Sequence, residues 1–84
     1  MRPVTVYSDE ICTLCHSVEN LLNAREIPYE KIILQEGTDA YEQLVAKSGM
    51  KSLPQVYIGS LLLGGYQETL GADQAGMLAD LLVD

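Results

Sequence analysis

Two sequence patterns meet in one early segment of the chain, Val4-Thr5-Val6-Tyr7-Ser8-Asp9-Glu10-Ile11-Cys12-Thr13-Leu14-Cys15. Its first four residues are β-branched or aromatic and alternate with period two, which predicts a strand. The polar residues 8–10 favour a helix start, and we expect a helix from about Thr13 to Arg25. The residues of its predicted buried face recur at helical spacing and are Leu14, Val18, Leu21 and Leu22. The two cysteines therefore fall at a strand-to-helix junction.

Strand and helix patterns alternate along the rest of the chain. We expect strands at 29–34, 55–58 and 61–63, and a helix at 39–47 with a capping box formed by Asp39 and Glu42. The last helix is expected from its apolar residues, which are Leu70, Met77, Leu78, Leu81 and Leu82. The order β-α-β-α-β-β-α predicts an α/β fold, a mixed four-stranded sheet with helices on both faces. Without a repeat or linker, the 84 residues are expected to form one domain, 1–84.

The composition excludes several classes of protein. Five Lys or Arg against twelve Asp or Glu give a formal net charge of −7, so the chain carries too few cations to bind nucleic acid. Apolar runs such as Leu61-Leu62-Leu63 are far shorter than the roughly 18 residues that span a membrane, and no signal-peptide pattern is present. We therefore expect a cytoplasmic protein with no nucleic-acid and no membrane partner. In that compartment a close cysteine pair is more often catalytic or metal-binding than structural.

The cysteine pair carries the chemistry of the sequence. Its i, i+3 spacing places both side chains on one helix face. Free backbone N–H groups at the helix start favour a thiolate at Cys12, so Cys12 is expected to be the nucleophile and Cys15 the resolving thiol. A zinc site would need four ligands, and only His16 is nearby. Cys-x-x-Cys-His is also a c-type haem attachment motif, for which Met50 or Met77 would be the distal ligand. We expect no metal, and we interpret His16 as a helix-surface residue.

Three motifs keep the order and spacing of a known family. They are residues 7–16 around the cysteine pair, the segment Ser52-Leu53-Pro54-Gln55-Val56-Tyr57-Ile58, and the pair Gly64-Gly65. In these motifs the chain resembles a glutaredoxin, and the resemblance runs from about Val4 to Leu82. It implies a thioredoxin-like fold and thiol–disulfide oxidoreductase activity, with glutathione as the usual reductant.

The resemblance also implies which residues bind glutathione. Pro54 matches the family's cis-proline, and the backbone of Leu53 before it would pair with the cysteine part of glutathione. After Gly64-Gly65, the N–H groups of Tyr66 and Gln67 would hold the γ-glutamyl carboxylate. Lys51 or Lys47 would replace a family arginine as partner of the glycyl carboxylate. The glutathione-binding residues implied in this way are Leu53, Pro54, Gly65, Tyr66, Gln67 and Lys51.

The sequence departs from the family pattern close to the nucleophile. The family typically has a basic residue where this chain has Asp9, and Asp9 and Glu10 oppose a thiolate at Cys12 about as strongly as the helix start favours it. We therefore expect Cys12 to be a weaker acid than its counterpart in the family. Two alternatives to glutathione-dependent reduction follow from the resemblance: reduction by a thioredoxin reductase, and an iron–sulfur cluster shared by two subunits. The expected partners are glutathione and disulfide-containing proteins, and the chain is expected to be a monomer.

Overall fold

One mixed sheet forms the centre of the computed structural model, which describes residues 2–10 and 12–83; Met1, Ile11 and Asp84 lie outside the described residues. Its strands are β1 (Val4–Ser8), β2 (Glu30–Ile33), β3 (Gln55–Ile58) and β4 (Leu61–Gly64). They lie in the order β2-β1-β3-β4, with β2 parallel to β1 and the other two pairs antiparallel. The mixed four-stranded sheet predicted from the sequence is therefore confirmed.

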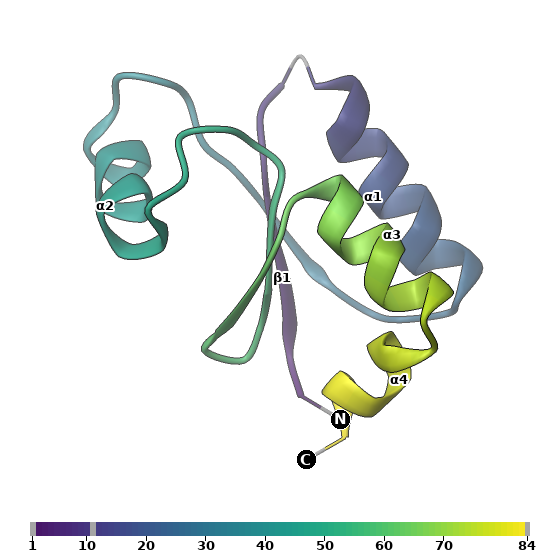
Figure 1. Cartoon of the computed structure of the whole chain (residues 1–84). Helices are drawn as coiled ribbons and strands as arrows, with labels where there is room; N and C mark the ends of the chain where they lie inside the picture. Colours follow the sequence, from purple (N-terminus) through teal and green to yellow (C-terminus); the bar gives the residue numbers. More distant parts are fainter. Residues whose placement is uncertain (1, 11, 84) are drawn as a thin grey trace.

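Helices cover both faces of this sheet (Figure 1). One face carries α1 (Thr13–Ala24), α3 (Tyr66–Gln74) and α4 (Met77–Leu82), and the other carries α2 (Asp39–Ser48). The larger core lies on the first face and includes Val6, Val18, Leu22, Val56 and Ile58, each at most 1% exposed. A smaller cluster of Leu34, Leu44 and Tyr57 lies under α2. The predicted α/β fold is thus confirmed. No helix within 2–10 and 12–83 is long and apolar enough to cross a membrane.

The carboxyl-terminal part differs from the prediction of a single last helix. It forms two helices, α3 and α4, so the order ends in β-α-α. Gly76 separates them with φ at 74°, a left-handed conformation that cannot continue a right-handed helix and that glycine adopts without strain. Two leucines of the predicted apolar pattern, Leu78 and Leu82 in α4, are nevertheless buried in the core.

Two local predictions are also wrong. Leu14 is 51% exposed, and the buried residues of α1 are Cys15, Val18 and Leu22, a stripe that begins one residue later. One residue turns a helix by about 100°, which is enough to move Leu14 off the buried face. At α2 the N-cap is Thr38 rather than Asp39, because the Thr38 hydroxyl accepts a hydrogen bond from the Tyr41 N–H at 3.3 Å.

Candidate functional site

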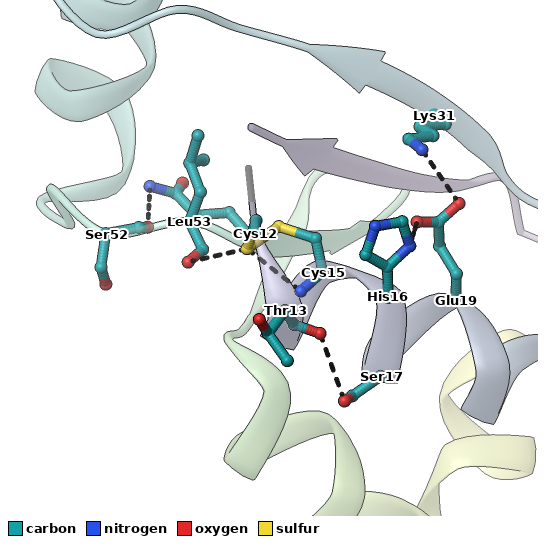
Figure 2. The surroundings of a disulfide bond; sticks show 10 residues. Cys12, Thr13, Cys15, His16, Ser17, Glu19, Lys31, Ser52 and Leu53 are labelled. Atoms are coloured by element: carbon teal, nitrogen blue, oxygen red, sulfur yellow. Dashed lines mark hydrogen bonds and ion pairs between the residues drawn. A yellow bond between two sulfur atoms is a disulfide. The ribbon is translucent and has the colours of Figure 1, made fainter. Parts of the chain in front are cut away.

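The two cysteines form a disulfide at the amino end of α1 (Figure 2). Cys12 is the N-cap of the helix, and its Sγ accepts a hydrogen bond from the Cys15 N–H at 3.1 Å. The two sulfurs differ in accessibility: Cys15 is 2% exposed, whereas Cys12 is only partly buried. An incoming thiolate can therefore reach Cys12 Sγ, while the chain covers Cys15. This difference agrees with Cys12 as the reacting sulfur and Cys15 as the resolving one.

Two features of the start of α1 favour a negative charge on the Cys12 sulfur. Once the disulfide is reduced, the Cys15 N–H and the positive end of α1 both stabilise a Cys12 thiolate. The Leu53 carbonyl oxygen lies 3.8 Å from Cys12 Sγ (Figure 2). A disulfide sulfur carries no proton, so this approach is a contact in the oxidised protein and becomes a hydrogen bond only with a protonated Cys12. The loop before Pro54 thus faces the Cys12 sulfur.

A cavity of about 220 Å³ lies beside Cys12. Lys51 and Leu53, which the resemblance assigns to glutathione binding, line this cavity together with Cys12. Two carboxylates, Asp9 and Glu36, line it as well. The cavity therefore offers one ammonium group and two carboxylates to any substrate that reaches the sulfur.

The other implied glutathione-binding residues lie at Pro54 and at the start of α3. The Leu53-Pro54 peptide bond is cis, as the resemblance implies. A Cβ placed on Gly65 would lie 3.5 Å from the Pro54 carbonyl oxygen, so the two segments are neighbours. Gly65 is the N-cap of α3, and its N–H already donates to Glu68 Oε1 at 2.8 Å. The N–H groups of Tyr66 and Gln67 stand in the first turn, where no intrahelical acceptor exists.

Comparison with known proteins identifies the family. The family model of glutaredoxins matches residues 4–62, more than half of the chain. The chain belongs to the glutaredoxin family. Glutaredoxin 3 of Escherichia coli K12 is 27% identical over 82 residues, which cover 98% of this chain and 99% of the relative. A glutaredoxin of Neisseria meningitidis serogroup A is 30% identical over 83 residues, 98% of both chains.

Solved glutaredoxin structures agree with this assignment. The crystal structure of a buckwheat glutaredoxin–glutathione complex superposes with a TM-score of 0.86 at 26% identity, over 96% of this chain and 76% of that one. Oxidised glutaredoxin 2 from Chlamydomonas reinhardtii superposes with a TM-score of 0.81 at 32% identity, over 96% and 79% of the two chains. This glutaredoxin is a thiol–disulfide oxidoreductase with a thioredoxin-like fold and Cys12 and Cys15 at disulfide distance.

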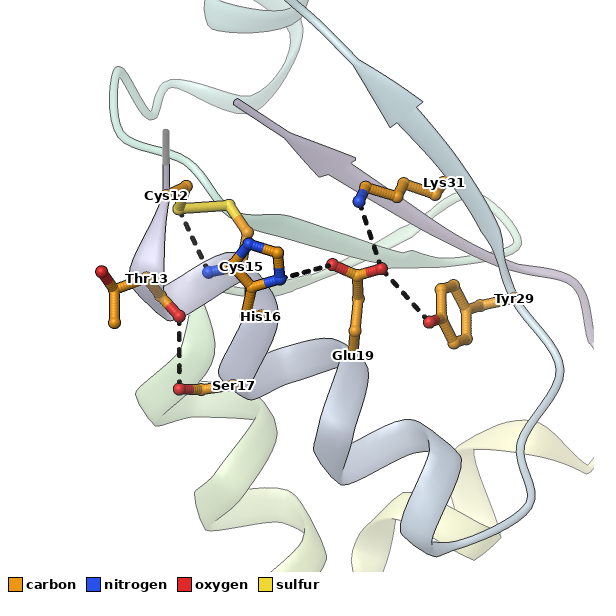
Figure 3. Close-up of polar contacts among 8 residues, drawn as sticks. All are labelled: Cys12, Thr13, Cys15, His16, Ser17, Glu19, Tyr29 and Lys31. Carbon is orange, nitrogen blue, oxygen red and sulfur yellow. Dashed lines mark hydrogen bonds and ion pairs between the residues drawn. A yellow bond between two sulfur atoms is a disulfide. The ribbon is translucent and has the colours of Figure 1, made fainter. Parts of the chain in front are cut away.

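A polar cluster connects α1 to the edge strand β2 (Figure 3). Glu19 Oε1 accepts from the Tyr29 hydroxyl at 3.3 Å and lies 3.3 Å from Lys31 Nζ. His16, directly after Cys15, has a 70% exposed side chain with Nδ1 at 3.9 Å from Glu19 Oε2. His16 is therefore a helix-surface residue, as the sequence predicts. Through Glu19 and Lys31 the cluster joins the middle of α1 to β2.

Sequence reasoning missed three residues of the site. Glu36 and Tyr41 line the Cys12 cavity, and the fully buried Gln55 donates hydrogen bonds to the loop that contributes Ser52 to it. No local pattern marks Glu36 or Tyr41, because they meet Cys12 only through the fold. Gln55 did carry a signal, since it is the polar residue at the start of the otherwise apolar strand β3.

A larger cavity, of about 600 Å³, lies at the carboxyl end of α1, away from the disulfide. Leu78 and Leu82 line it, with Arg25 and Asp73 joined by hydrogen bonds of 2.9 and 3.0 Å. The hydrogen bonds that Arg25 donates to Asp73, and the negative charge of Asp73, raise the pKa of Arg25. Within residues 2–10 and 12–83, no three His, Cys, Asp or Glu side chains are grouped so that they would hold a metal ion.

Proposed function

We propose that this glutaredoxin reduces glutathione-mixed disulfides and protein disulfides with electrons drawn from glutathione. The observation that carries the proposal is the accessible Cys12 sulfur at the start of α1, next to a buried Cys15 and to Lys51 and Leu53. The similarity to a buckwheat glutaredoxin in complex with glutathione supports glutathione as the reductant.

Reduction of a glutathione-mixed disulfide needs only Cys12. Its thiolate attacks the glutathione sulfur, the substrate S–S bond breaks, and the electron pair of that bond leaves with the substrate thiolate. A second glutathione thiolate then attacks the sulfur of the bound glutathione. Glutathione disulfide forms, and Cys12 leaves as a thiolate. The helix start and the Cys15 N–H stabilise that leaving group.

Reduction of a protein disulfide also needs Cys15. Cys12 first forms a mixed disulfide with the substrate protein, and the Cys15 thiolate then attacks Cys12 Sγ and releases the second substrate thiolate. The product is the Cys12–Cys15 disulfide present in this structure. Two glutathione molecules reduce it, and the first attacks Cys12 Sγ because Cys15 is 2% exposed.

Glutathione would bind along the surface from the Cys12 cavity to the start of α3. The Leu53 backbone before Pro54 pairs with the cysteine part, and the Lys51 ammonium attracts the glycyl carboxylate. At the other end, the N–H groups of Tyr66 and Gln67 bind the γ-glutamyl carboxylate, as helix N-termini bind anions. Gly65 lets the ligand approach the backbone. Support comes from the shared cavity of Lys51, Leu53 and Cys12 and from the contact distance between Gly65 and Pro54.

The proposal extends to partners and compartment. Proteins with disulfides are the second class of substrate, and the exposed Leu14 next to Cys15 offers them an apolar contact. We expect residues 1–84 to act as one monomeric domain without a metal. A reducing compartment such as the cytoplasm supplies the glutathione that keeps the cysteines reduced.

A coupled assay tests the electron source. The protein is given a mixed disulfide of glutathione and a small thiol, either with glutathione and glutathione reductase or with thioredoxin reductase alone. We expect turnover in the first arm and none above background in the second. Turnover with thioredoxin reductase alone would contradict the proposal and favour the alternative electron donor.

Removing the ammonium group of Lys51 should have a moderate effect on KM. Lys51→Ala should raise the KM for the glutathione-mixed disulfide about threefold, because an exposed ion pair contributes about 0.2–1 kcal/mol, while kcat stays within about twofold. Lys47→Ala is the matched control: it removes the same charge, but Lys47 Nζ lies 4.8 Å from the Tyr57 ring centroid and does not line the Cys12 cavity. Steady-state kinetics at low salt measure both. Equal KM changes in the two variants would show an effect of net charge alone.

A further inference from the structure

Gln55 is a fully buried polar residue at the first position of β3, directly after Pro54. Its amide nitrogen donates two hydrogen bonds, to the Met50 carbonyl at 3.0 Å and to the Ser52 carbonyl at 3.2 Å. The next three residues of the strand, 56–58, are apolar and buried. The Gln55 amide therefore forms its hydrogen bonds with the loop of residues 50–53 and not with residues of the apolar core.

That loop is held by side chains along its length. Besides the two carbonyls bound by Gln55, the Lys51 carbonyl accepts from the Tyr41 hydroxyl. The Met50 N–H donates to Ser48 Oγ at 3.1 Å. With the carbonyls of 50, 51 and 52 engaged in this way, the next carbonyl, that of Leu53, faces Cys12 Sγ. The loop also carries Lys51 into the cavity beside Cys12.

The buried side-chain amide of Gln55 lowers the stability of the fold through one of its atoms. Gln55 Oε1 is buried and has no hydrogen-bond partner among the described residues. A buried polar atom without a partner destabilises the fold, and an apolar side chain of similar size would avoid that penalty. The two donated hydrogen bonds are therefore the feature of Gln55 that an apolar side chain would lack.

We propose that Gln55 is a positioning residue for the reaction: its amide fixes the loop 50–53 so that the Leu53 backbone and Lys51 face a substrate bound to Cys12. The inference rests on the proposed function, in which the Leu53 backbone pairs with glutathione. Gln55 itself touches no reacting atom. Its effect should therefore be on substrate binding and not on the intrinsic reactivity of the Cys12 thiol.

The first test removes both donors at nearly constant volume. Gln55→Met should raise the KM for the glutathione-mixed disulfide about tenfold and leave kcat within about twofold. Alkylation of reduced Cys12 by iodoacetamide, measured at a pH where the thiol is fully ionised and donates no hydrogen bond to the Leu53 carbonyl, should keep its rate within about twofold. Leu82→Val, in the core on the other face of the sheet and away from the disulfide, is the control for a general loss of stability, and its KM should stay at the wild-type value. An unchanged KM in Gln55→Met, or the same KM change in Leu82→Val, would overturn the inference.

A second variant, Gln55→Glu, tests the positioning role through the pH dependence of KM. In Gln55→Glu, an ionised carboxylate would face the Met50 and Ser52 carbonyls and could not donate, whereas its protonated form donates one hydrogen bond. Burial and these carbonyls raise the pKa of the introduced carboxyl, so donation returns as pH falls. The ratio of variant to wild-type KM should therefore fall as the pH is lowered. A ratio that does not change with pH would contradict the positioning role.

The inference and the proposed function can fail separately. If the wild type does not turn over a glutathione-mixed disulfide, the proposed function fails. The role of Gln55 is then judged by amide hydrogen exchange in the oxidised protein. Faster exchange of the Met50 N–H, which donates to Ser48 Oγ, in Gln55→Met, with α1 unchanged, would support the loop-fixing role. Equal exchange in Gln55→Met and wild type would overturn it.

Discussion

Replacing Cys12 by serine should abolish reduction of glutathione-mixed disulfides, with a rate loss of more than about 1,000-fold, because a neutral hydroxyl does not attack sulfur at neutral pH. Cys15→Ser should keep the rate on these substrates within about threefold, since Cys12 completes that reaction with glutathione. On a protein disulfide, Cys15→Ser should lose most of its activity, because the mixed disulfide is no longer resolved internally. Initial rates in the coupled glutathione assay measure all three values.

The two cysteine variants control for each other. Both prevent the Cys12–Cys15 disulfide, so any loss of stability from the missing cross-link is shared. Thermal unfolding under reducing conditions, where the wild type also lacks the bond, should give similar midpoints for all three proteins. Activity that survives in Cys12→Ser and disappears in Cys15→Ser would reverse the assigned roles.

Replacing Gly64 by alanine should destabilise the protein by about 2–4 kcal/mol. Gly64 is buried and has φ at +126°, a backbone conformation that side chains rarely adopt. An added Cβ would lie 2.8 Å from three atoms of Glu68: Cβ, Cγ and Oε1. The start of α3, where Glu68 accepts from the Gly65 N–H, would have to move. Denaturant unfolding should show the loss, and the KM for glutathione substrates should rise with it.

Gly71 is the matched control for this glycine. It lies inside α3, and a Cβ there would meet nothing within 4 Å. Gly71→Ala should therefore stabilise the protein by about 0.5–1 kcal/mol, since alanine favours a helix interior over glycine. Two alanine variants with equal free energies of unfolding would contradict the steric explanation for Gly64.

Much of the fold could be predicted because its local signals agree with its packing. The alternating strand at 4–7, the helix after it and the hairpin at Gly59-Ser60 each carry a pattern that tertiary contacts reinforce. The position of the cysteine pair was predictable for the same reason, since a Cys-x-x-Cys segment at a helix start is a local arrangement. The break at Gly76 was missed because a helical apolar pattern continues on both sides of it.

The remaining parts of the site depend on contacts between distant segments. Tyr41 and Glu36 reach the cavity beside Cys12 only after α2 and the loop before it pack against the sheet. Leu14 was assigned to the buried face because leucine is apolar, whereas Cys15 takes that place and leaves Leu14 at 51% exposure. Spacing alone does not settle which of two adjacent residues faces the core when both are compatible with burial.

Trapping the reaction intermediate tests the assignment of Cys12 most directly. Reduced Cys15→Ser protein is treated with glutathione disulfide, and the adduct is located by mass spectrometry of its peptides. The proposed mechanism predicts one glutathione, on Cys12, which free glutathione then removes. A protein that acquires no glutathione, or an adduct that free glutathione cannot release, would contradict glutathione-dependent exchange at Cys12.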